Sequence, residues 1–186
     1  MALYTGKGDK GTTKLFGCDQ RISKSSAITE ALGSLDECNS FLGLVKVKTK
    51  EADWVVGESG SHLHEIVHRI QETLFIIQAE LAGAPKTIQE STLQDAEKLI
   101  ADIEKELPLI TSFFISGGSE LATSFDFART LARRAERRVV AVIEEGEREM
   151  GEWSLAYLNR LSSILYALAR LSNHKSGIKE QPPSYR

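Results

Sequence analysis

The sequence predicts an all-α protein, a five-helix up-and-down bundle in a single domain of residues 1–186. Apolar residues recur every three or four positions through five long segments, which is the spacing of one helix face. Glycine, proline or serine punctuates the chain between these segments, so the connections are short. With 186 residues and 41% hydrophobic content, the chain can bury one substantial core. We expect a loop at 1–24, the bundle at 25–173 and a polar tail at 174–186.

Most of the five helices have a recognisable start or stop. A polar connection at 49–60 separates the first two helices, and a capping pattern at Ser91 or Thr92 opens the third. Pro108 ends the third helix, and Ser119 can cap the fourth. The predicted helices cover about 25–48, 61–81, 91–107, 119–146 and 151–173.

Composition excludes several classes of function. A net charge of −3 gives no general attraction to nucleic acid or to an acidic membrane surface. No run approaches the roughly 18 apolar residues of a membrane span, and the first residues lack the apolar core of a signal peptide. We therefore expect a cytoplasmic protein with no membrane or nucleic-acid partner. Cys18 and Cys38 have no metal-ligand spacing and are interpreted as reduced thiols without a role.

A ladder of arginines is the most informative feature of the chain. Five of them fall within ten residues: Arg129, Arg133, Arg134, Arg137 and Arg138. Arg129, Arg133 and Arg137 are four residues apart, so they share one helix face, where like charges repel. Asp126 and Glu136 are the only local compensation. The face is therefore a phosphate or carboxylate site or a seam against acidic residues elsewhere, and an exposed charged face is the plain alternative.

The N-terminal segment from Thr5 to Lys14 contains three glycines, three lysines and three threonines. Glycine lets backbone N–H groups turn toward a ligand, and hydroxyl and ammonium groups can complete a phosphate cradle. The composition of the segment therefore predicts an anion-binding loop, and a disordered basic leader is the alternative. Gly6, Gly8 and Gly11 match a dinucleotide-binding pattern, but the strand and helix that this pattern requires are missing.

One short segment matches a zinc-binding sequence pattern, but its set of ligands is incomplete. His64, Glu65 and His68 match the H-E-x-x-H pattern, which on a helix sets two imidazoles one turn apart. A third ligand is not evident, since Gln71 stands where one extended form of the motif has glycine. We favour solvated histidines on the polar face of the second helix.

Five short blocks together resemble the PduO-type ATP:cob(I)alamin adenosyltransferases, in family order across nearly the whole chain. The blocks are Tyr4–Gly11, Gly33–Glu37, Ser116–Gly118, Arg133–Arg138 and Tyr157–Ser162. The resemblance implies a homotrimer of five-helix bundles with active sites between adjacent subunits. It also implies ATP and cobalamin as substrates, Mg²⁺ as cofactor and an electron-donating reductase, a flavoprotein, as partner.

The implied reaction needs no protein nucleophile. Co(I) attacks the 5′ carbon of ATP, and triphosphate leaves as adenosylcobalamin forms. The enzyme must position the substrates and stabilise charge on the leaving group, for which arginines and an amide-rich loop are suited. A non-catalytic bundle that binds corrinoid and ATP, and a zinc hydrolase, are the alternative functions.

The resemblance assigns roles to particular residues. Asp36 and Arg129 match a family pair that forms a salt bridge across the subunit interface, and Arg129, Arg133, Asp36 and Phe113 are the implied catalytic set. Glu136 is the candidate for organising Mg²⁺ or its waters. The implied ATP contacts are Thr5, Gly6, Lys7, Gly8, Thr13, Lys14, Lys24, Arg133, Arg134, Glu136, Arg137 and Asn159.

The corrinoid pocket is expected around an aromatic side chain. In the family, an apolar pocket displaces the lower axial ligand of cobalt, and Phe113 falls at the aromatic position. A core phenylalanine is the alternative, and Phe114 could replace Phe113 after a shift of one residue. Ser116 departs from the family, in which proline usually precedes the two glycines, so the rigidity of this turn is open.

Overall fold

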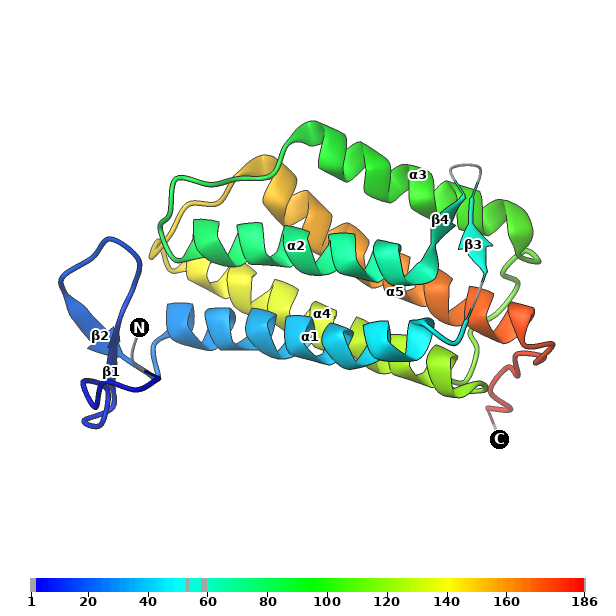
Figure 1. The fold of residues 1–186 in the computed structure, drawn as a ribbon, viewed down its shortest axis with the longest axis horizontal. Helices are drawn as coiled ribbons and strands as arrows, with labels where there is room; N and C mark the ends of the chain where they lie inside the picture. The colour runs from blue at the N-terminus through cyan, green and yellow to red at the C-terminus, as the bar shows by residue number, and fades with distance from the viewer. Residues whose placement is uncertain (1–2, 53, 58–59, 186) are drawn as a thin grey trace.

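The computed structural model describes residues 3–52, 54–57 and 60–185 and contains the predicted bundle. Successive helices run in alternating directions along the long axis of the molecule (Figure 1). The N-terminal segment stands beyond one end of the bundle, and the C-terminus lies at the other. The five helices of the described residues are α1 (Ala27–Thr49), α2 (Leu63–Leu81), α3 (Glu90–Glu106), α4 (Glu120–Glu144) and α5 (Glu152–Lys175).

The helix order in space differs from the order in sequence. α1 packs between α2 and α4, and α5 packs between α4 and α3. α4 buries Ala128, Ala132 and Ala135 at helical spacing, and these small side chains let the neighbouring backbones approach closely. Burial of the alanine face turns the opposite face of α4 outward, and this is the face that carries the arginine ladder.

Two short hairpins correct the expectation that 1–24 and 49–60 are plain loops. β1 (Thr12–Lys14) pairs antiparallel with β2 (Arg21–Ser23), and β3 (Val55–Val56) pairs with β4 (Ser61–His62). Strands of two or three residues are too short to leave a periodic signal. The second hairpin also takes Ser61 and His62 out of the predicted second helix.

The helix ends confirm one predicted cap, correct another and move the end of the fifth helix. The backbone N–H of Ala122 donates to the Ser119 hydroxyl at 3.1 Å, which confirms Ser119 as the cap of α4. α3 begins at Glu90, so the predicted cap at Ser91 or Thr92 is wrong, because both lie within its first turn. α5 continues beyond the predicted end at 173.

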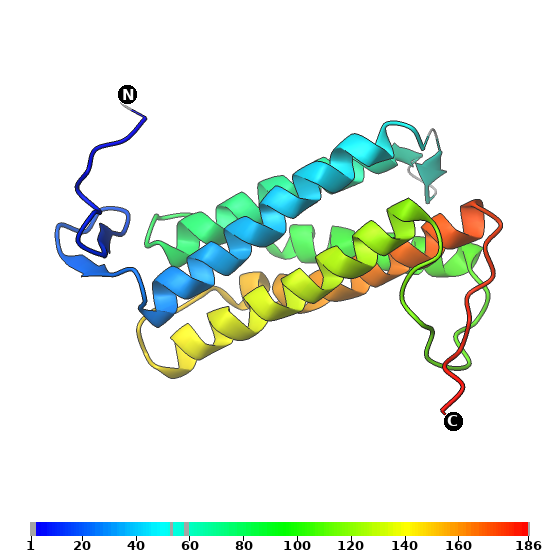
Figure 2. The same ribbon diagram turned by 90° about the horizontal axis from the view of Figure 1, so that it is seen from below.

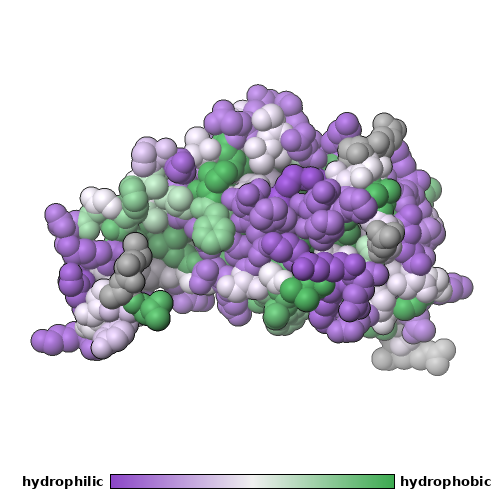
Figure 3. Space-filling model, in the orientation of Figure 1, coloured by the Kyte–Doolittle hydropathy of each residue, from purple (hydrophilic) through white to green (hydrophobic). Residues whose placement is uncertain are grey.

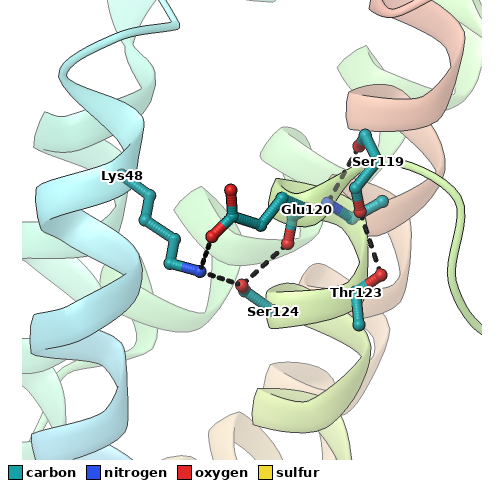
Figure 4. A network of polar contacts seen from close by, with 6 residues as sticks. Lys48, Ser119, Glu120, Thr123 and Ser124 are labelled. Atoms are coloured by element: carbon teal, nitrogen blue, oxygen red, sulfur yellow. Dashed lines mark hydrogen bonds and ion pairs between the residues drawn. The ribbon is translucent and has the colours of Figure 1, made fainter.

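A polar cluster ties the end of α1 to the start of α4 (Figure 4). The Lys48 ammonium donates to the Glu120 carboxylate at 2.5 Å and to the Ser124 hydroxyl at 3.3 Å. The Ser124 hydroxyl donates in turn to the Glu120 backbone carbonyl at 2.8 Å. The hydrogen bond and charge of Lys48 lower the pKa of Glu120. This cluster fixes the helix that follows the Ser116–Gly118 turn.

A groove between two helices lies apart from the arginine ladder. On the face in Figure 3, hydrophilic side chains cover much of the middle, and hydrophobic ones gather toward the end with the N-terminal segment. A groove of about 560 Å³ lies between α2 and α3, floored by Tyr157 and Ile164 of α5. Burial raises the pKa of Tyr157 to about 12. No arginine of α4 lines this groove.

Candidate active site

The structure divides the arginine ladder into paired and unpaired members. The Arg134 guanidinium donates a hydrogen bond to the Glu37 carboxylate, and Arg138 lies 3.6 Å from Glu30. Both carboxylates belong to α1, so these two arginines form a seam between α4 and α1. The ATP contact predicted for Arg134 stays a prediction, since this side chain already has an anionic partner.

Arg133 and Arg137 are exposed on α4 one turn apart. Neither forms an ion pair with any residue in the part of the chain that the structure describes. Two adjacent unpaired guanidiniums repel each other and favour an anion that bridges them. The Glu136 carboxylate between them accepts a hydrogen bond from the Asn159 amide at 3.0 Å. The packing of α4 on α5 therefore places Asn159 beside Glu136, between Arg133 and Arg137 in the sequence of α4, and the ATP contacts of these residues stay predictions.

Arg129 has an incomplete set of partners. Its guanidinium carbon lies 6.0 Å from the centroid of the Tyr166 ring, and its Nε lies 3.5 Å from the Asp126 carboxylate. That Nε is buried and makes no hydrogen bond within the described structure. Asp36 is exposed on α1 and forms no ion pair with a described residue of its own chain. The predicted pairing of Asp36 with Arg129 across a subunit interface stays a prediction.

A cavity of about 640 Å³ lies between the arginine ladder and the loop of residues 107–118 that follows α3. We call this segment the aromatic loop because it carries Phe113 and Phe114. Phe113, Arg129 and Arg133 all line it, so three of the four implied catalytic residues share one space. Phe113 is 78% exposed, whereas Phe114 is half-buried and also lines the cavity. This difference favours Phe113 as the ring available to a ligand over both the core alternative and the one-residue shift.

Tyr166 is a cavity residue that sequence reasoning missed. It lies on α5 one turn after Ser162, the last residue of the Tyr157–Ser162 block, and that spacing was the available signal. Partial burial raises the pKa of Tyr166, so its hydroxyl stays protonated at neutral pH.

The Ser116–Gly118 turn is held without the family's proline. The Gly117 N–H donates to the Asp126 carboxylate at 3.2 Å, and the Asn173 amide donates to the Gly117 carbonyl at 2.8 Å. Gly118 has φ +110°, and a Cβ there would lie 2.3 Å from the Asn173 side-chain oxygen. Side chains from α4 and α5 therefore provide the rigidity that Ser116 does not.

The N-terminal hairpin gathers several of the predicted phosphate-binding groups. Arg21, which sequence reasoning missed, donates to the backbone carbonyls of Lys7 and Thr12, both at 2.6 Å. A Cβ at Gly8 would lie 3.0 Å from the Lys24 ammonium, so glycine lets that ammonium close onto the loop. Figure 2 shows the hairpin beyond the end of the bundle where α1 begins.

The other residues of the N-terminal segment that were predicted to contact ATP have varied surroundings. Thr5 and Lys7 are exposed, and the Lys7 N–H donates to the Thr5 hydroxyl at 3.4 Å. Thr13 is half-buried in β1, and Lys14 forms an ion pair with Asp19 at 2.8 Å. An ATP contact by Lys14 would have to compete with this exposed pair.

The zinc interpretation gains no support. His64 and His68 are exposed, as the favoured interpretation predicted. The Glu65 carboxylate accepts from the His62 backbone N–H at 3.1 Å and so caps α2 instead of serving as a base. Across residues 3–52, 54–57 and 60–185, no cluster of three or more His, Cys, Asp or Glu could hold a metal ion. No described helix is long and apolar enough to cross a membrane.

The fold and the site define a helical-bundle protein with two exposed arginines, unpaired within the described residues, beside a large cavity lined by aromatic side chains. The sequence model of the cobalamin adenosyltransferase family matches residues 3–172. The chain belongs to this family.

Named relatives and solved structures agree with that assignment. The chain is 38% identical to a corrinoid adenosyltransferase of Bacillus subtilis, over 96% of this chain and 90% of the relative. It is 39% identical to the corrinoid adenosyltransferase PduO of Citrobacter freundii over 94% of this chain, and it spans about half of that relative's length. A variant PduO-type ATP:corrinoid adenosyltransferase of Lactobacillus reuteri, complexed with cobalamin and ATP, superposes with a TM-score of 0.86 at 28% identity. That match covers 99% of this chain and 97% of the other.

Proposed function

We propose that the protein is an ATP:cob(I)alamin adenosyltransferase. Co(I) attacks the 5′ carbon of ATP, a cobalt–carbon bond forms, and the carbon–oxygen bond to the triphosphate breaks. The electron pair of that bond leaves with the triphosphate, so the products are adenosylcobalamin and triphosphate. The observation that carries the proposal is the pair of unpaired arginines, Arg133 and Arg137, beside a cavity that Phe113 and Arg133 share.

The two halves of the site match the two substrates. Guanidiniums suit a triphosphate because each fork can donate two parallel hydrogen bonds to phosphate oxygens. Arg133 and Arg137 would stabilise the charge that builds on the leaving group, and the Gly6–Lys14 loop with Lys24 would hold the nucleotide. The exposed Phe113 ring would cover the lower face of the corrin and exclude a ligand from cobalt.

Glu136 fits a Mg²⁺ ion that is shared with ATP. Mg²⁺ in nucleotide sites takes one or two carboxylates, substrate phosphates and waters, so a three-carboxylate cage is not required. Glu136 is half-exposed between Arg133 and Arg137 and is held by Asn159. Mg²⁺ bound there would neutralise charge on the triphosphate.

A homotrimer with sites between subunits is supported by two features. Asp36 is exposed and lacks an ion-pair partner among the described residues, and the Arg129 side chain is 27% exposed. The Asp36 carboxylate of a neighbouring copy could therefore accept a hydrogen bond from the Arg129 guanidinium. Leu44 and Val47 of α1 are also more than half exposed and would be covered by a partner helix. The flavoprotein reductase and the cytoplasmic location stay predictions.

The test compares wild type with His64→Ala, each treated with a zinc chelator and supplied with ATP, Mg²⁺ and cob(I)alamin under anaerobic conditions. The proposal predicts adenosylcobalamin at equal rates from both proteins. A zinc hydrolase would form no adenosylcobalamin, so absence of that product from wild type would contradict the proposal. Loss of the product on chelation or in His64→Ala would show that the histidine motif takes part in the reaction. Binding of corrinoid and ATP without consumption of ATP would identify a carrier instead.

A further inference from the structure

Arg170 is a buried charge that the site described above does not use. It lies on α5 with 4% of its surface exposed. Its Nε donates to the Glu180 carboxylate at 2.9 Å, and a terminal nitrogen donates to the Pro108 carbonyl at 3.1 Å. Its guanidinium carbon lies 5.3 Å from the centroid of the Phe114 ring. One side chain therefore joins a bundle helix, the aromatic loop and the C-terminal tail.

The predicted polar tail is packed against the rest of the protein. The Ile178 N–H donates to the Asn173 carbonyl at 2.9 Å, which turns the chain back after α5. The Ile115 N–H donates to the Gln181 carbonyl at 2.9 Å, so tail and loop share a backbone hydrogen bond. Figure 2 shows the tail, in red, beside the loop, in green, that leads into α4.

The aromatic loop depends on such contacts for its shape. Between the end of α3 and Ser119 the chain forms no helix or strand. Leu109 and Phe113 are 90% and 78% exposed, so the loop gains little stability from burial of its own side chains. Phe114 is the half-buried ring, and Arg170 lies over it.

We propose that Arg170, paired with Glu180, is a positioning residue for corrinoid binding. It acts through Phe114 and Pro108, which hold the loop so that Phe113 faces the cavity. This inference rests on the proposed function, because the ligand that Phe113 would meet is the corrin ring.

The chemistry favours arginine at this position. A planar fork can donate to Glu180 and Pro108 in two fixed directions while its face covers an aromatic ring, which lysine cannot do with one ammonium. The side chains of Arg170 and Glu180 are 5% and 16% exposed, so solvent screens the pair little. Loss of the charge on Glu180 leaves a buried guanidinium poorly compensated, and the tail and loop are the parts free to shift.

The test uses Glu180→Gln, which keeps the shape of the side chain and removes no core group. Arg170→Lys is the second variant. The matched control is Glu106→Gln, which breaks the Lys175–Glu106 pair at the same end of the bundle, where both side chains are about one third exposed. The measurements are KM for cob(I)alamin, KM for ATP, the dissociation constant for cob(II)alamin and the midpoint of thermal unfolding.

We expect Glu180→Gln and Arg170→Lys to raise KM and the dissociation constant for the corrinoid about tenfold. KM for ATP should stay near that of wild type, although the unfolding midpoint should fall, because a buried guanidinium without its carboxylate partner is destabilising. Glu106→Gln should behave as wild type. If KM and the dissociation constant for the corrinoid are unchanged in Glu180→Gln, the positioning role is wrong, and the proposed transferase function is unaffected. An equal loss of affinity for ATP and for corrinoid would overturn it in favour of a merely structural role. Wild type that neither binds nor converts corrinoid would overturn the proposed function as well.

Discussion

The guanidinium of Arg134 on α4 is bound to the carboxylate of Glu37 on α1, whereas its sequence neighbour Arg133 has no anionic partner within the described chain. Adjacent arginines on one helix thus have different surroundings, because they point about a quarter-turn apart. Arg134 faces the seam with α1, and Arg133 faces the cavity beside Phe113. This contrast lets structural and catalytic roles be tested on the same helix.

Arg133→Ala should lower turnover by roughly 10²- to 10³-fold, the usual effect of removing a donor that stabilises developing negative charge. The helix should remain folded, since alanine favours helix and Arg133 is exposed. Steady-state kinetics and circular dichroism check the two expectations. Arg138→Ala is the matched control, because it removes only an exposed pair with Glu30 and should keep normal turnover. Near-normal turnover in Arg133→Ala would show that the assigned role is wrong.

Asp36→Asn should weaken association of the subunits or binding of the corrinoid, because it removes the charge proposed to meet Arg129 of a neighbouring copy. Sedimentation equilibrium and a corrinoid titration measure the two effects. Glu30→Gln, on the same helix, serves as control and should associate as wild type does. If Asp36→Asn matches wild type in both measurements, the pairing across the interface does not exist.

Gly118→Ala should destabilise the protein by about 1 to 3 kcal/mol, because alanine is strained at positive φ and the new Cβ would meet Asn173. Chemical denaturation measures the free energy of unfolding. Gly33→Ala provides the contrast, since a Cβ on that helical glycine meets no atom within 4 Å and should stabilise the helix by about 0.5 to 1 kcal/mol. Equal stability of Gly118→Ala and wild type would mean that the turn is not held as described.

The two cysteines should react differently with an alkylating reagent at pH 8. Cys18 is exposed, whereas burial raises the pKa of the Cys38 thiol to about 12. Since the thiolate is the reactive form, Cys38 should stay protonated and unlabelled in the folded protein. Mass spectrometry should detect one label per native chain and two after denaturation. Rapid double labelling of the native chain would contradict the burial of Cys38.

Sequence periodicity predicted all five helices because each buries one continuous apolar face over many turns. It missed the strand pairs near Thr12 and Val55, because strands of two or three residues are too short to show a period. It also misplaced the start of α3, since Ser91 fits both a cap and a first turn.

The site was predicted less completely than the fold. The residues that would bind ATP came from the family resemblance, and the structure joins two of them, Glu136 and Asn159, on neighbouring helices. The division of the ladder could not be predicted, because Glu37 lies 97 residues from Arg134 in sequence and only packing brings them into contact. For the same reason the sequence did not predict the contact of Glu180, in the polar tail, with Arg170.

The most direct test of the account is the product ratio of a single anaerobic turnover. Wild-type protein would be mixed with ATP, Mg²⁺ and chemically reduced cob(I)alamin, and adenosylcobalamin and phosphate products would be separated by chromatography. Attack on the 5′ carbon predicts one intact triphosphate for each adenosylcobalamin. Phosphate or diphosphate in place of triphosphate, or bound substrates with no adenosylcobalamin, would contradict the proposed reaction.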